Sequence, residues 1–89
     1  RKSMNISVEI TFTPLHDKYK AHIQDFITNL RTGGFTISET PLSTQLYGSY
    51  DELMSFLTTQ IKTALSKEEK AVMHLKLFNA NRSDYVPSF

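Results

Sequence analysis

Hydrophobic and polar residues alternate strictly near the start of the chain. Between residues 5 and 13 every second residue is apolar, and the residues between them are serine, glutamate or threonine. The apolar set is Ile6, Val8, Ile10 and Phe12. Because successive side chains of a strand point to opposite faces of a sheet, this pattern predicts a strand with one buried and one polar face.

After Pro14 and Leu15 the apolar spacing changes from two residues to three or four. This period is typical of an amphipathic helix. The residues that follow it are Tyr19, Ile23, Phe26, Ile27 and Leu30. Asp17 is placed to cap the start of this helix, and the pair Gly33-Gly34 is placed to end it.

Two short alternating segments follow, at residues 35–40 and 43–48, and Pro41 separates them. Proline cannot donate to a strand ladder, so the break at Pro41 predicts two strands joined as a hairpin. In the second segment, Ser43, Gln45 and Tyr47 share one face, which is therefore polar.

A second helix and a last strand complete the pattern. Ser49 and Glu52 have the spacing of a capping box, and apolar residues then recur at helical spacing up to Leu65. The charged stretch 67–70 is expected to end this helix. Residues 71–78 alternate again and predict a fourth strand.

The predicted order is strand, helix, strand, strand, helix, strand, which is the α+β arrangement called ferredoxin-like. We expect one domain over residues 1–89, with 79–89 as a polar tail, and two helices on one face of a four-stranded antiparallel sheet. Right-handed crossovers would place the first and third strands in the middle. The uncovered face would carry Ser7, Glu9, Thr11, Ser43, Gln45, Tyr47, His74 and Lys76.

Charge and composition narrow the range of partners. The chain has 10 basic and 9 acidic residues, scattered without a basic stripe, which disfavours nucleic acid as a partner. It has no cysteine and no long apolar run, so we expect no disulfides, no thiolate metal site and no membrane insertion. A cytoplasmic location is the expectation that follows.

The sequence offers no catalytic motif. No nucleophile lies beside a base, no paired-carboxylate motif is present, and the histidines are not spaced as a metal-ligand set. His16 and His22 are expected to be solvated, whereas His74 falls on the open sheet face and could touch a ligand. An acylphosphatase-like enzyme would need an arginine in its first loop, and residues 14–17 supply none. We therefore expect no catalysis and no cofactor.

Three blocks of the chain resemble the YkoF-like family, which binds thiamine and hydroxymethylpyrimidine. They are residues 8–15 (VEITFTPL), 42–52 (LSTQLYGSYDE) and 72–75 (VMHL). The related small single-domain thiamine-binding proteins look similar. The chain departs from the pattern at Gln45, where a branched apolar residue is common, and in carrying one domain rather than two.

The resemblance implies non-catalytic binding of thiamine or its pyrimidine half by domains that pair as tandem copies or as dimers. A homodimer or homotetramer is therefore expected. The positions carried over from the family are Glu9, Thr11, Ser43, Thr44 and Tyr47.

The chemistry of the residues points the same way. An aminopyrimidine has donors and acceptors on one planar edge, which Ser43, Thr44 and Gln45 could match, while Tyr47 could stack on the ring. Glu9 could pair with the amidine-like edge or with the thiazolium charge. The alternative is a structural or regulatory module whose polar face pairs sheets and holds no ligand.

Overall fold

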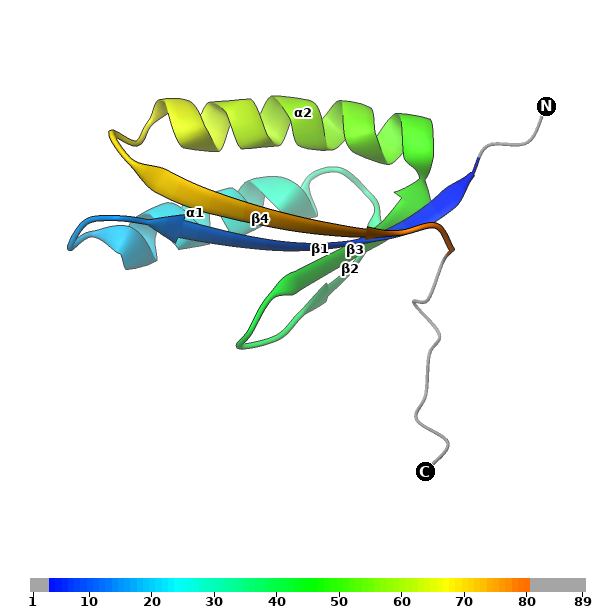
Figure 1. Ribbon diagram of the computed structural model, residues 1–89, viewed down its shortest axis with the longest axis horizontal. Coiled ribbons are helices and arrows are strands. Elements are labelled where there is room, and N and C mark those ends of the chain that lie inside the picture. The colour runs from blue at the N-terminus through cyan, green and yellow to red at the C-terminus, as the bar shows by residue number, and fades with distance from the viewer. Residues whose placement is uncertain (1–3, 81–89) are drawn as a thin grey trace.

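The computed structural model describes residues 4–80, which form four strands and two helices (Figure 1). In chain order they are β1 (Asn5–Pro14), α1 (Tyr19–Arg31), β2 (Thr36–Glu39), β3 (Thr44–Ser49), α2 (Tyr50–Ser66) and β4 (Ala71–Phe78). The predicted order of elements is confirmed.

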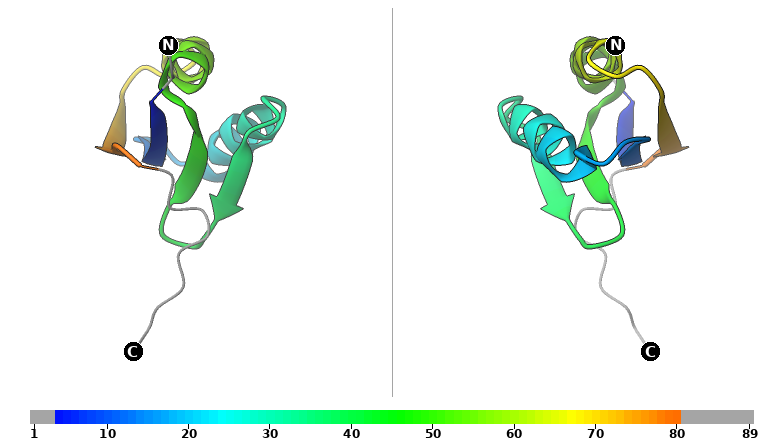
Figure 2. Two further views of the ribbon diagram at one scale, coloured as in Figure 1. Left: turned by 90° about the vertical axis from the view of Figure 1, so that its right-hand side faces the viewer. Right: turned by 90° about the vertical axis from the view of Figure 1, so that its left-hand side faces the viewer.

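The four strands form one antiparallel sheet in the order β2-β3-β1-β4, so β3 and β1 are central as predicted. Both helices lie on the same side of the sheet (Figure 2). This is the predicted α+β ferredoxin-like arrangement. Neither α1 nor α2 covers the opposite face of the sheet.

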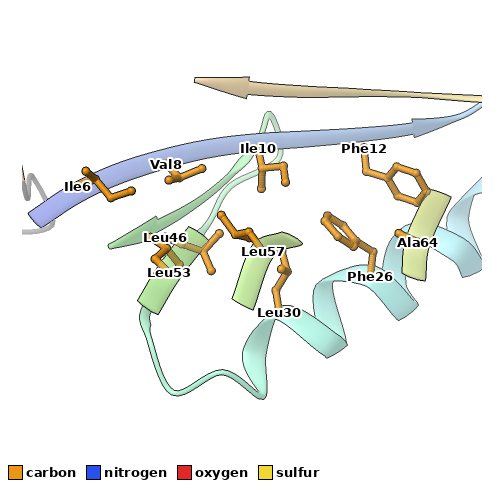
Figure 3. Close-up of a cluster of buried hydrophobic side chains, with 10 residues drawn as sticks. All are labelled: Ile6, Val8, Ile10, Phe12, Phe26, Leu30, Leu46, Leu53, Leu57 and Ala64. Atoms are coloured by element: carbon orange, nitrogen blue, oxygen red, sulfur yellow. The ribbon is translucent and has the colours of Figure 1, made fainter. Parts of the chain in front are cut away.

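The hydrophobic core lies between the sheet and the two helices. The apolar side chains of β1 point toward α1 and α2, as the alternation predicts (Figure 3). The buried apolar side chains are Ile6, Val8, Ile10, Phe12, Phe26, Leu30, Leu46, Leu53, Leu57 and Ala64. Thr44 is also buried, and it faces the helices from β3.

The two predicted helix caps differ from what the structure shows. Helix α1 begins after Lys18 and no side chain caps it, so the prediction that Asp17 is the cap is wrong by one position. Ser49 does occupy the cap position of α2, but its hydroxyl donates to the Glu52 carboxylate at 2.8 Å and does not accept a hydrogen bond from a backbone N–H of the helix. The first free N–H of α2, on Tyr50, instead donates to the Met4 carbonyl at 2.7 Å, which fixes α2 to the start of β1.

Gly48 allows one aromatic ring to pack against β3. A Cβ atom at this position would lie 2.8 Å from the Phe35 ring, a distance that real Cβ contacts do not reach. The Phe35 ring in turn packs against the Phe56 ring of α2, with ring centroids 5.4 Å apart. Glycine at position 48 is thus required by the packing of the hairpin against α2. The predicted stop after α1 is also confirmed, because Gly34 has a φ of +77° that ends the helical path.

The two edge strands of the sheet, β2 and β4, differ in length and in how much apolar surface they expose. Strand β2 is only four residues long, and its Glu39 carboxylate accepts two hydrogen bonds from the Arg31 guanidinium at 2.7 Å. Strand β4 is eight residues long, and Leu75 and Leu77 on its helix side are 37% and 46% exposed. The helices therefore leave part of the apolar face of β4 uncovered.

Of the predicted polar tail at residues 79–89, only Asn79 and Ala80 belong to the described part of the chain. The rest of that prediction lies outside the described residues. Neither of the two helices is long and apolar enough to cross a membrane.

Candidate functional site

A shallow hollow of about 270 Å³ lies on the open face of the sheet, over the central strands and β4. It is lined by Ser7, Val8, Glu9, Gln45, Tyr47, Lys76 and Phe78. The strand register arranges all of these side chains except Val8 in two neighbouring rows across β3, β1 and β4. One row is polar, Gln45-Glu9-Lys76, and the other has two aromatic ends, Tyr47-Ser7-Phe78.

The Glu9 carboxylate is the centre of the polar row. Its Oε2 atom accepts a hydrogen bond from the Ser43 hydroxyl at 2.8 Å, and the Gln45 amide nitrogen lies 3.5 Å from the same atom. The Gln45 amide also donates to the Ser43 hydroxyl at 2.6 Å. Three polar side chains, from β1, β3 and the residue just before β3, thus hold one another in place.

The other oxygen of Glu9 is less firmly held. Glu9 Oε1 lies 3.5 Å from Lys76 Nζ, and the Lys76 side chain is 80% exposed. This is longer than the ~2.7–3.2 Å of a good N–H···O hydrogen bond, and exposed ion pairs of this kind contribute little. Glu9 Oε1 therefore remains open to a donor from solution.

The surroundings of Glu9 favour its charged form. The hydrogen bond from Ser43 is the largest effect and lowers the pKa of Glu9 below its ordinary value of 4.5. Burial opposes this shift, and the nearby Lys76 charge lowers the pKa further by a smaller amount. The hollow thus presents a carboxylate anion at neutral pH.

The chain that leaves β4 borders one end of the hollow. The Ser7 hydroxyl donates to the carbonyl of Ala80 at 2.6 Å. Within residues 4–80, the hollow between Tyr47 and the Glu9 carboxylate is nevertheless not filled by the chain's own side chains.

The structure brings some of the predicted site residues together and separates others. Glu9, Ser43, Gln45 and Tyr47 lie together on the open face. Thr11 and Thr44 line a second hollow of about 210 Å³, between α1 and the β2–β3 turn, at the point where the β1–β3 pairing ends with Ile10 opposite Thr44. His74 is on the open face opposite Thr11 and does not line the first hollow.

Two sets of contacts were not predicted from the sequence. Lys76 pairs with Glu9 because these residues are direct neighbours across β1 and β4, a register that the alternation alone does not give. His16 is exposed and His22 is half-buried, so both rings remain partly solvated as expected. What the sequence did not predict is that both rings also contact the Glu68 carboxylate. Glu68 is 52 residues from His16 and 46 residues from His22 in the sequence, so their proximity appears only in the fold.

Solved structures with the same fold include proteins from several microorganisms. A Streptococcus pneumoniae protein is 28% identical, with a TM-score of 0.79 over 84% of this chain and 86% of that one. A Thermotoga maritima protein, assigned provisionally to thiamine biosynthesis or salvage, is 17% identical, with a TM-score of 0.75 over 82% and 81% of the two chains. A hypothetical protein of Methanocaldococcus jannascii is 18% identical, with a TM-score of 0.73 over 84% and 79%. No protein-family model and no curated protein matches the chain.

Proposed function

We propose that this protein binds thiamine or its hydroxymethylpyrimidine half reversibly on the open face of the sheet, without catalysing a reaction. The proposal rests on the two neighbouring rows of side chains in the hollow, one polar and centred on Glu9, the other with aromatic rings at both ends. A flat heterocycle with a polar edge could lie with its ring against Tyr47 and its edge toward Glu9. The provisional assignment of the Thermotoga maritima protein supports the choice of thiamine as the first ligand to test.

The chemistry of an aminopyrimidine suits the Glu9 carboxylate. The exocyclic amino group of the ring is a hydrogen-bond donor, and Glu9 Oε1 is an acceptor held only by the exposed Lys76. Ser43 holds the other carboxylate oxygen at 2.8 Å and is itself held by the Gln45 amide at 2.6 Å, so the acceptor is already oriented before a ligand arrives. Such preorganisation lowers the entropic cost of binding.

The size of the hollow favours the pyrimidine half as the part that is held most closely. Its volume of about 270 Å³ is near the lower end of small-molecule sites, which span about 300–1,000 Å³. The pyrimidine ring would lie in the hollow, and the thiazolium ring of thiamine would extend toward its rim.

Binding can be tested by heating the protein with and without thiamine, hydroxymethylpyrimidine and, as an unrelated control, nicotinamide. We expect a saturable rise in the melting temperature with the first two compounds, because a ligand that binds only the folded state stabilises it. No rise at millimolar ligand would favour the alternative, an assembly module whose polar face pairs sheets.

Replacing Tyr47 by alanine should weaken binding of hydroxymethylpyrimidine about fivefold. Aromatic pairs contribute about 0.5–1.5 kcal/mol beyond area burial, and about 1 kcal/mol corresponds to that loss. Isothermal titration calorimetry would measure it. The matched control is Tyr50→Ala, which removes a half-exposed ring on α2 and should leave the affinity unchanged. An unaltered affinity in the Tyr47 variant would remove this ring from the site.

We also propose that two copies of the chain pair through β4. Val72, Leu75, Leu77 and Phe78 of this strand are 37–49% exposed, and Leu65 of the neighbouring α2 is 38% exposed. A long edge strand has a row of unpaired backbone N–H and C=O groups, and with exposed apolar side chains beside them it favours pairing with a strand of another chain. The hollow is lined by Lys76 and Phe78, so a partner at β4 would lie beside it.

Substitution of Leu77 by lysine should convert this dimer into a monomer. A charge placed in an apolar strand-to-strand interface must be desolvated without a partner. Light scattering coupled to size-exclusion chromatography would give the mass of each form. Leu42→Lys, at an 88% exposed position in the β2–β3 turn, should leave the dimer intact. A wild-type protein with the mass of a single chain would contradict the pairing.

A further inference from the structure

Two histidines and one glutamate from distant parts of the sequence meet at one end of the molecule. His16 lies in the β1–α1 connection, His22 on α1, and Glu68 in the α2–β4 connection. These two connections lie at the same end, on the left of Figure 1, and are joined by a hydrogen bond from the Leu15 amide to the Lys70 carbonyl at 3.1 Å. The cluster is separate from the open face of the sheet that carries Glu9.

The contacts within this cluster are direct. His16 Nε2 lies 2.7 Å from Glu68 Oε1, and His22 Nδ1 contacts Glu68 Oε2. The two imidazole rings meet nearly edge to face, with centroids 4.6 Å apart. One potential ligand atom from each of the three residues lies within 4.8 Å of the other two.

The Glu68 side chain is unusual in its burial. It is only 2% exposed, whereas each histidine side chain is about one third exposed. Glutamate is rarely buried without a cationic or hydrogen-bonding partner. The two histidines are the partners that the Glu68 carboxylate contacts.

From this geometry we propose that His16, His22 and Glu68 bind a divalent transition-metal ion, with zinc as the test ion. Two imidazole nitrogens and one carboxylate oxygen form a ligand set that suits zinc. A cavity of about 90 Å³ adjoins the cluster and has room for a water molecule as a fourth ligand. Its polar lining is His22, Asp25, Asn29, Lys67 and Glu68, and the rest of its wall is apolar. The site goes beyond the proposed thiamine binding and does not depend on it.

An ion would take the place of the protons that now lie between the histidines and Glu68. In a tetrahedral site with metal–ligand distances of about 2.0–2.2 Å, ligand atoms are roughly 3.3–3.6 Å apart. The His16–Glu68 contact would therefore open from 2.7 Å by somewhat less than about 1 Å. His16 lies in an exposed turn, where such a movement is easily accommodated.

Binding would also change the tautomer of His16. The Lys18 amide donates to His16 Nδ1 at 3.0 Å, so the proton of neutral His16 is on Nε2, facing Glu68. A metal on Nε2 moves this proton to Nδ1, and the Lys18 amide then loses its acceptor. The Lys18 amide resonance therefore reports on the site without any assay of function.

The test is titration of the metal-free protein with Zn²⁺ by calorimetry and with Co²⁺ by visible absorption. We expect one ion per chain, tetrahedral Co²⁺ bands and a shift of the Lys18 amide resonance. His22→Gln and Glu68→Gln should each lower the Zn²⁺ affinity at least about tenfold, the loss typical of removing even an outer-shell partner in a metal site. His74→Gln, on the open sheet face, should leave it unchanged.

Thermal unfolding of each metal-free variant checks that it is folded. Should Glu68→Gln not fold, His16→Gln provides the same test, because His16 is an exposed residue outside the helices and strands. Wild-type protein that binds no Zn²⁺, or binding that survives the His22 and Glu68 substitutions, would overturn the proposal. The contacts of His16 and His22 with Glu68 would then serve only to hold the β1–α1 and α2–β4 connections together.

Discussion

Replacing Glu9 by glutamine is expected to weaken thiamine binding by about 10- to 150-fold. The substitution keeps the shape of the side chain and removes its charge. Hydrogen bonds to charged groups contribute about 1.5–3 kcal/mol, which corresponds to this range of affinity. The neutral hydroxymethylpyrimidine should lose less than the cationic thiamine, because only thiamine carries a full charge for the carboxylate to attract. Calorimetry with both ligands measures the difference.

The control for this experiment is Glu39→Gln, which makes the same chemical change on the same sheet. Glu39 pairs with Arg31 and does not line the hollow, so the ligand affinity should stay at the wild-type value. Equal losses for thiamine and its neutral half in the Glu9 variant would argue against a role of the charge. Because the pKa of Glu9 is lowered, its contribution should be lost only at pH values below 4.5.

The largest expected effect on folding is that of Leu57→Ala. Leu57 on α2 is fully buried in the core between the helices and the sheet (Figure 3). Leucine-to-alanine substitutions at such positions lower the free energy of unfolding by about 2–5 kcal/mol, through lost burial and the cavity left behind. For a domain of this size, each kcal/mol lowers the melting temperature by about 4–8 °C. Differential scanning calorimetry would detect a loss of this size.

Leu42→Ala makes the same change at a position that is 88% exposed. It should alter the free energy of unfolding by less than about 0.5 kcal/mol, as is typical of surface substitutions. If both variants unfold at the wild-type temperature, Leu57 does not occupy the core position described above.

The fold was largely predictable from the spacing of apolar residues. The alternation over residues 71–78 predicts the bounds of β4, and the change of period after Pro14 predicts α1. The helix starts were less predictable, because a cap depends on one residue's backbone conformation. Asp17 precedes the cap position by one residue, and Tyr50 finds its acceptor in Met4, which the sequence cannot place nearby.

The candidate site was predictable only in part. Alternation assigns Glu9, Gln45 and Tyr47 to one face, because the period of a strand is two. The contact between Glu9 and Lys76 depends on the register of β1 and β4, which periodicity does not determine. The meeting of His16 with Glu68 depends on where two connections lie, and only the topology reveals that they share one end of the sheet.

The contrast between the two sheet edges sets a limit on how large an assembly can become. In a two-fold pair joined through β4, the outermost strand at both ends of the combined sheet would be β2. Strand β2 is only four residues long, so it has few backbone N–H and C=O groups with which a third chain could pair. Its Glu39 side chain is also charged and paired with Arg31, which is typical of edge strands that do not pair further. If the chain pairs through β4 as proposed, lateral growth would stop at two subunits, and the protein would not polymerise into fibres.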